Sequence, residues 1–131
     1  MSIANEMLAL ATESRQASRV IATLSSGVKN ELLLKMAEQL EANREKLQEA
    51  NVHDLQAGRD KGMATAMLDR LELSEKVIAG MAEGLREVAA LPDPVGEVTN
   101  MWLRPNGIRV GRQRIPLGVI GIIYESRPNV T

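Results

Sequence analysis

The chain has 131 residues, of which 44% are hydrophobic and 25% are charged, as in an ordinary globular domain. A formal net charge of −1 and an aromatic content of 2% argue against nucleic acid and against an anionic membrane surface as partners. The sequence has no cysteine and one histidine, which excludes disulfide bonds and thiolate or multi-histidine metal sites, so we expect no metal ion. Its longest apolar run is far too short to span a bilayer and its N-terminus does not read as a secretory signal, so we expect a cytoplasmic protein.

Residues 1–94 carry the apolar spacing of amphipathic helices. The pattern predicts, in chain order, a helix over residues 3–24, a second that ends near residue 50, short helices over 52–60 and 64–71, and a longer helix over 75–90. Asn51 is expected to cap the third of these and Ser74 the last. The last helix should end at about Ala90, before Leu91-Pro92, because proline cannot continue a helix.

After Pro94 the apolar period changes from 3.6 to 2, which indicates strands. Two short strands are expected within residues 95–115, and Asn106-Gly107 between them is a strong hairpin-turn signal. The sequence therefore predicts a β-hairpin arm over residues 95–115.

The final segment, residues 116–131, contains at 119–123 a run of Val and Ile broken only by glycine. Such a run is typical of a strand buried on both faces in a parallel sheet. Parallel neighbours need crossover connections and further strands, so we expect the opening of a larger α/β protein, with this segment as the first strand of a Rossmann-like sheet. Gly118 and Gly121 lie inside the strand pattern and do not form a dinucleotide-binding fingerprint.

The polar loop after this strand is the candidate site, because ligands of open α/β sheets bind beyond the carboxyl ends of the strands. It contains Glu125, Ser126, Arg127, Pro128 and Asn129. Arg127 suits a phosphate or a carboxylate, and the neutral donors Ser126 and Asn129 suit an oxyanion. The alternative is an ordinary strand-to-helix loop in which Asn129 or Thr131 caps the next helix.

Several segments together resemble one enzyme family. Pro116–Gly121 followed by Tyr124–Thr131 resembles the first-strand signature of the γ-glutamyl phosphate reductases, which belong to the aldehyde dehydrogenase superfamily. Met67–Leu71, Leu91–Gly96 and Arg112–Gly118 agree with the same family, so the resemblance extends over essentially the whole chain.

The resemblance implies an NADP(H)-dependent reductase that converts L-glutamyl 5-phosphate to L-glutamate 5-semialdehyde and phosphate in proline biosynthesis. In this family a cysteine displaces the phosphate, and the chain has none, so the 131 residues alone are expected to be inactive. Asn129 matches the asparagine that helps form the oxyanion hole, and Glu125, Ser126, Arg127 and Pro128 match the loop that lines the cofactor cleft.

By the same resemblance, residues 1–131 form the N-terminal part of a cofactor-binding domain, and the arm over residues 95–115 joins subunits into a homo-oligomer. The expected ligands are a small-molecule substrate, glutamyl 5-phosphate, and NADP(H). The alternative from another class is a non-catalytic helical interaction module or a truncated gene product.

Overall fold

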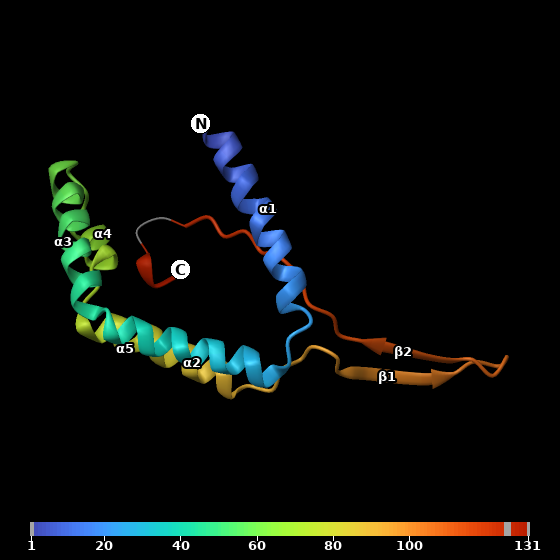
Figure 1. Cartoon of the computed structure of the whole chain (residues 1–131). Helices are drawn as coiled ribbons and strands as arrows, with labels where there is room; N and C mark the ends of the chain where they lie inside the picture. Colours follow the sequence, from blue (N-terminus) through green and yellow to red (C-terminus); the bar gives the residue numbers. More distant parts are fainter. Residues whose placement is uncertain (1, 125–126, 131) are drawn as a thin grey trace. The chain divides into compact units, whose positions relative to one another are not determined.

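The computed structural model describes residues 2–124 and 127–130 (Figure 1). The helices and strands of these residues are α1 (Ile3–Ile21), α2 (Ser26–Ala42), α3 (Arg44–Asp60), α4 (Thr65–Leu71), α5 (Glu75–Ala90), β1 (Val98–Leu103), β2 (Arg109–Gln113) and the 3-10 turn η1 (Pro128–Val130). Packing divides the chain into two compact units. The hairpin unit consists of residues 1–26 and 92–121, and the helical unit of residues 27–91 and 122–131.

The core of the helical unit is small and is built from α2 and α5. Its buried apolar side chains are Ala37, Ile78, Ala82 and Ala89. Beside them, Arg86 of α5 donates two hydrogen bonds to the carboxylate of Glu41 on α2, at 3.0 and 2.6 Å. These bonds lower the pKa of Glu41, so their contribution to stability is lost as the pH falls through that pKa.

The break between the second and third helices lies at Asn43, not at Asn51, so the prediction that Asn51 caps a helix is wrong. Asn51 lies inside α3 and is only 4% exposed. Its Nδ2 donates to the carbonyl oxygen of Leu71 at 2.9 Å, and its Oδ1 accepts from the backbone N–H of Leu73 at 2.8 Å. The side chain thus makes cap-like bonds to a distant segment and not to its own helix.

The remaining helix boundaries follow the local signals in the sequence. The Ser74 hydroxyl accepts a hydrogen bond from the backbone N–H of Val77 at 3.3 Å, which confirms it as the N-cap of α5. That helix ends at Ala90, before Leu91 and Pro92, as predicted. The first helix is three residues shorter than expected, and none of its residues is buried.

The predicted hairpin is confirmed. β1 and β2 pair antiparallel, with Trp102 opposite Val110 and Leu103 opposite Arg109. Gly107 has a φ of +83°, a value that glycine adopts without strain. Asn106 Oδ1 accepts a hydrogen bond from the backbone N–H of Ile108 at 3.2 Å, and this side-chain bond stabilises the turn.

Residues 115–124, which include the predicted first sheet strand, carry no strand in this structure. A strand is defined by hydrogen bonds to a neighbour, and the sheet formed by the described residues contains only β1 and β2. The apolar side chains of the segment are exposed, Leu117 by 89% and Ile120 by 65%. The parallel sheet therefore stays a prediction.

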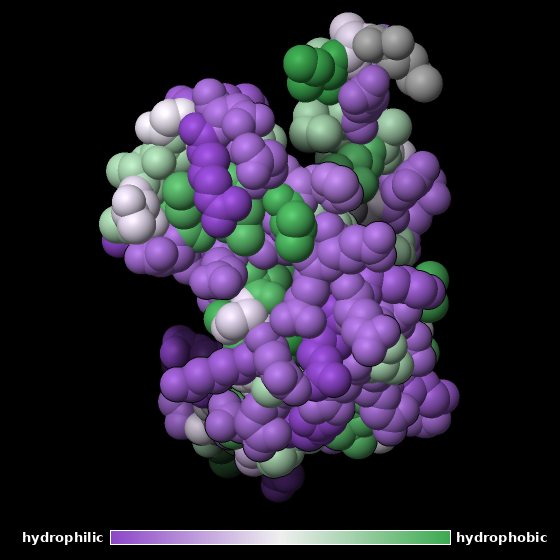
Figure 2. All heavy atoms as spheres, turned by 90° about the vertical axis from the view of Figure 1, so that its left-hand side faces the viewer, coloured by the Kyte–Doolittle hydropathy of each residue, from purple (hydrophilic) through white to green (hydrophobic). Residues whose placement is uncertain are grey.

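Hydrophilic residues dominate the face drawn in Figure 2, and apolar residues come to the surface there in separate patches. No helix among residues 2–124 and 127–130 combines the length and the apolar character needed to cross a membrane.

Replacing Asn51 with Ala should lower the free energy of unfolding by roughly 2–4 kcal/mol, because a carbonyl and an N–H at half-buried residues each lose their partner. Urea unfolding followed by circular dichroism measures this change. His53→Ala, two residues along the same helix at an exposed position, is the control and should stay within about 0.5 kcal/mol of the parent. A parent-like midpoint for Asn51→Ala would show that the two bonds contribute little.

Candidate functional site

The structure describes only part of the candidate loop over residues 125–129. Glu125 and Ser126 lie outside the described residues, so their predicted roles are not addressed by the structure. Arg127, Pro128 and Asn129 lie at the 3-10 turn η1, where the backbone N–H of Val130 donates to the carbonyl of Arg127 at 3.0 Å. The side chains of Arg127 and Asn129 are exposed and Pro128 is half-buried.

Arg127 and Asn129 share a surface depression of about 320 Å³ with the end of α4 and the start of α5. We call it the α4–loop depression. Its lining residues are Asp69, Arg70, Glu72, Val77, Arg127, Asn129 and Val130. The volume lies at the lower end of the range for small-molecule sites. Pro128 is not among the lining residues, so its contribution is to shape the turn.

The polar groups of the α4–loop depression are two guanidinium groups, two carboxylates and one amide. Within residues 2–124 and 127–130, the side chains of these five residues form no hydrogen bond and no ion pair. Groups of both signs of charge therefore line one small space.

Two features of α3 place α4 beside the loop. Asn51 holds the backbone of Leu71 and Leu73, the residues on either side of Glu72. Gly58 lets α4 approach closely, because a Cβ atom there would lie 3.0 Å from Leu68 Cδ2. The position of the carboxylates thus depends on residues outside the depression.

Sequence reasoning missed Asp69, Arg70 and Glu72 as site residues. Asp69 and Arg70 belong to Met67–Leu71, one of the segments that carry the family resemblance, and this was the available signal. Nothing in the sequence pattern alone places residues 69–72 next to residues 127–130.

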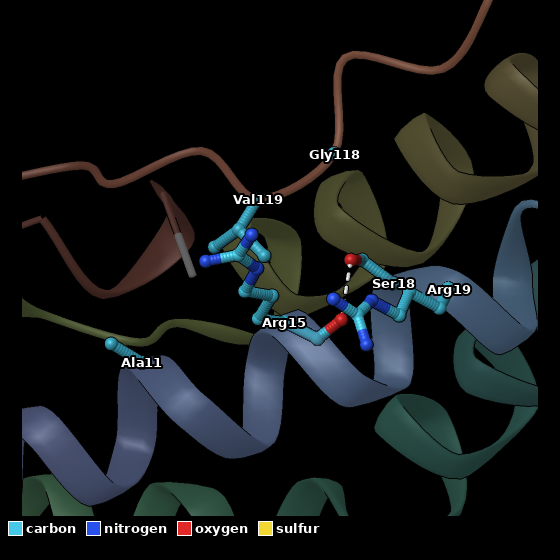
Figure 3. A pocket seen from close by; sticks show the side chains of 6 residues that line it. All are labelled: Ala11, Arg15, Ser18, Arg19, Gly118 and Val119. Carbon is cyan, nitrogen blue, oxygen red and sulfur yellow. Dashed lines mark hydrogen bonds between the residues drawn. The ribbon is translucent and has the colours of Figure 1, made fainter.

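A second depression, of about 440 Å³, lies in the hairpin unit between α1 and residues 118–119 (Figure 3). Arg15 and Arg19, one helical turn apart, line it with Ser18, whose hydroxyl donates to the carbonyl of Arg15 at 2.9 Å. Both arginines are exposed, and none of the polar side chains that line the depression, Arg15, Ser18 and Arg19, is buried.

Among the described residues, no group of three or more His, Asp or Glu side chains is placed to hold a metal ion. Within the predicted cofactor loop, Arg127 is exposed, and among residues 2–124 and 127–130 its guanidinium has no ion-pair partner. A guanidinium of this kind suits a phosphate or a carboxylate.

The whole chain is similar to curated proteins that share the name γ-glutamyl phosphate reductase. It is 63% identical over 131 residues to the γ-glutamyl phosphate reductase of Geotalea daltonii and 57% identical over 131 residues to that of Moorella thermoacetica. The resemblance to γ-glutamyl phosphate reductase is confirmed. The match covers 100% of this chain and 31% of each relative, so the chain spans about a third of their length.

Solved structures of γ-glutamyl phosphate reductases agree. The enzyme from Thermotoga maritima superposes with a TM-score of 0.91 and 42% identity over 95% of this chain and 30% of its own. The enzyme from Saccharomyces cerevisiae gives a TM-score of 0.87 and 33% identity over 99% of this chain and 32% of its own. No protein-family model matches the chain.

Proposed function

We propose that the chain is the N-terminal segment of a cytoplasmic NADPH-dependent γ-glutamyl phosphate reductase of proline biosynthesis. The complete enzyme converts L-glutamyl 5-phosphate to L-glutamate 5-semialdehyde and phosphate. The observation that carries the proposal is the 63% identity over all 131 residues to a reductase of which the chain spans 31%. The substrate, the cofactor and the reaction belong to the complete enzyme.

The proposed chemistry divides between this segment and the rest of the enzyme. A cysteine from the remainder attacks the acyl phosphate, because this segment contains no thiol. Bound NADPH supplies the hydride. Asn129 donates a hydrogen bond from its side-chain amide to the acyl oxygen as negative charge develops on it, and the exposure of the side chain at the depression supports this role.

Arg127 binds a phosphate group of the substrate or of the cofactor. Its guanidinium lines the α4–loop depression two residues from Asn129, so the two side chains serve neighbouring groups of one ligand. Glu125, Ser126 and Pro128 complete the predicted cofactor loop. An ionic contact of this kind stabilises the bound ground state and the transition state alike.

The apolar run over residues 116–123 becomes the first strand of the parallel sheet when the remainder of the enzyme supplies its neighbours. Its exposure supports this proposal, because the transfer of such side chains from water into a sheet is favourable by about 25 cal/mol per Å². Residues 1–131 then belong to the cofactor-binding domain.

The hairpin arm is proposed to join subunits into a homo-oligomer. Among the described residues its sheet has only two strands, and Trp102 and Ile108 are 40% and 57% exposed. A two-stranded hairpin is marginal in water unless a face or an edge is covered, and a second subunit provides that cover.

The reductase assay tests the proposal directly. The complete protein should oxidise NADPH in the presence of glutamyl phosphate, whereas the 131-residue chain should not, because it has no cysteine. Absorbance of NADPH measures both rates, with heat-treated protein as the control. A complete protein without this activity, or a 131-residue chain with it, contradicts the proposal.

Asn129→Ala in the complete enzyme should lower kcat by about 10²–10³ with little change in substrate KM, since one oxyanion donor is lost. Arg127→Ala should instead raise the KM of the ligand whose phosphate it holds. Steady-state rates with each substrate varied in turn separate the two effects. Asn5→Ala and Arg59→Ala, at exposed helix positions away from the depression, should behave like the parent. A parent-like kcat for Asn129→Ala would favour a structural role for this residue.

Replacing Trp102 and Ile108 together with Asp should convert the complete enzyme to a smaller species, because charges in a buried interface are costly. Multi-angle light scattering gives the molar mass. Val52→Asp, which changes a residue that is 60% exposed on α3, is the matched control and should leave the mass unchanged. An unaltered mass for the arm variant would place the subunit contact elsewhere.

A further inference from the structure

We infer that the end of α4 recognises the α-amino-acid end of the substrate, with Asp69 and Glu72 holding its ammonium group and Arg70 its α-carboxylate. The inference rests on the proposed function and adds a specificity determinant to it. It starts from the α4–loop depression, in which these three side chains face the same space as Arg127 and Asn129.

The charge pattern of the depression fits a zwitterion better than a simple anion or cation. Asp69 and Glu72 supply two carboxylates, and Arg70 and Arg127 two guanidinium groups. None of them is paired with another residue in the described part of the chain. A ligand with an ammonium group, a carboxylate and a phosphate satisfies both signs, whereas a plain phosphate leaves the two carboxylates without a partner.

The arrangement of these groups also follows the covalent order of glutamyl phosphate. Its phosphate and its acyl oxygen are both attached to C5, and the proposed binders of these groups, Arg127 and Asn129, lie two residues apart at one 3-10 turn. Its ammonium and carboxylate groups are both attached to Cα, and their proposed binders lie within four residues at the end of α4.

The size of the depression agrees with this assignment. Cα and C5 are three bonds apart, which is about 4 Å in the extended arrangement, so both ends of the substrate reach one small site. Val77 and Val130 also line the depression and offer apolar contact to the two methylene groups between the ends.

The consequence is selectivity for the α-amino group. A substrate of the same length without that group leaves the carboxylates of Asp69 and Glu72 without a charged partner on the ligand, which weakens the complex. Glutaric semialdehyde is such a compound, because it differs from glutamate 5-semialdehyde only by the absent α-amino group.

The experiment measures kcat/KM of the complete enzyme in the oxidative direction, with phosphate and NADP, for glutamate 5-semialdehyde and for glutaric semialdehyde. The parent should prefer the amino compound. Asp69→Asn and Glu72→Gln should each lower kcat/KM for the amino compound by about 10- to 100-fold, as expected for one charged hydrogen bond. Turnover of glutaric semialdehyde should change little and shows in the same assay that the variants fold.

Two controls sharpen the result. Arg70→Met should lower kcat/KM for both aldehydes, since both carry the carboxylate. Glu87→Gln, at an exposed position of α5 outside the depression, should change neither. If the parent enzyme turns over both aldehydes and the Asp69 and Glu72 variants keep the parent's ratio of kcat/KM between them, this inference is overturned and the proposed function stands. A parent enzyme without any turnover overturns the proposed function and the inference with it.

Discussion

The side-chain amide of Asn51 supplies the hydrogen-bond partners for two backbone groups in the connection between α4 and α5. Leu71 and Leu73, which it binds at 2.9 and 2.8 Å, leave α4 and approach α5, so no helical hydrogen bond is available to these two groups. Burial of the amide to 4% exposure excludes water as a competitor and strengthens both bonds. The direction of α4, and with it the place of Asp69 and Glu72, depends on this contact together with the packing of Leu68 against Gly58.

Apolar burial within the described residues is modest. Ile78 is the one large side chain that is fully buried there, and α1 contributes no buried residue. Large apolar side chains are exposed instead on α1, on the hairpin and on residues 115–123. Exposure on this scale marks surfaces that pack against other protein. It agrees with a chain that spans 31% of its relatives' length.

Features with a local cause were predictable from the sequence. Ser74, Pro92 and Asn106-Gly107 act through neighbours a few residues away, and each produced the expected cap, stop or turn. The break at Asn43 was missed because the apolar stripe continues across it. The Asn43 side chain donates to the carbonyl of Gln39 at 2.9 Å and so competes with the helix.

Tertiary features were not predictable in this way. Arg127 and Asn129 were selected because ligands of open α/β sheets bind beyond the carboxyl ends of the strands. No local pattern predicts that Arg127 lies near Asp69, which is more than fifty residues away in the sequence. Asn51 was misread for the same reason, since an asparagine favours a helix end whenever only its neighbours in sequence are considered.

The two halves of the candidate site have independent structural causes. Its loop half is fixed by Pro128, whose ring restricts φ, and by the hydrogen bond that closes η1. Its α4 half is fixed by Asn51 and by the close approach that Gly58 permits. Both halves lie within the helical unit, although residues 122–130 follow the hairpin unit in the sequence. A change in the turn therefore leaves the anchor of α4 in place, and the two halves of the candidate site can be varied separately.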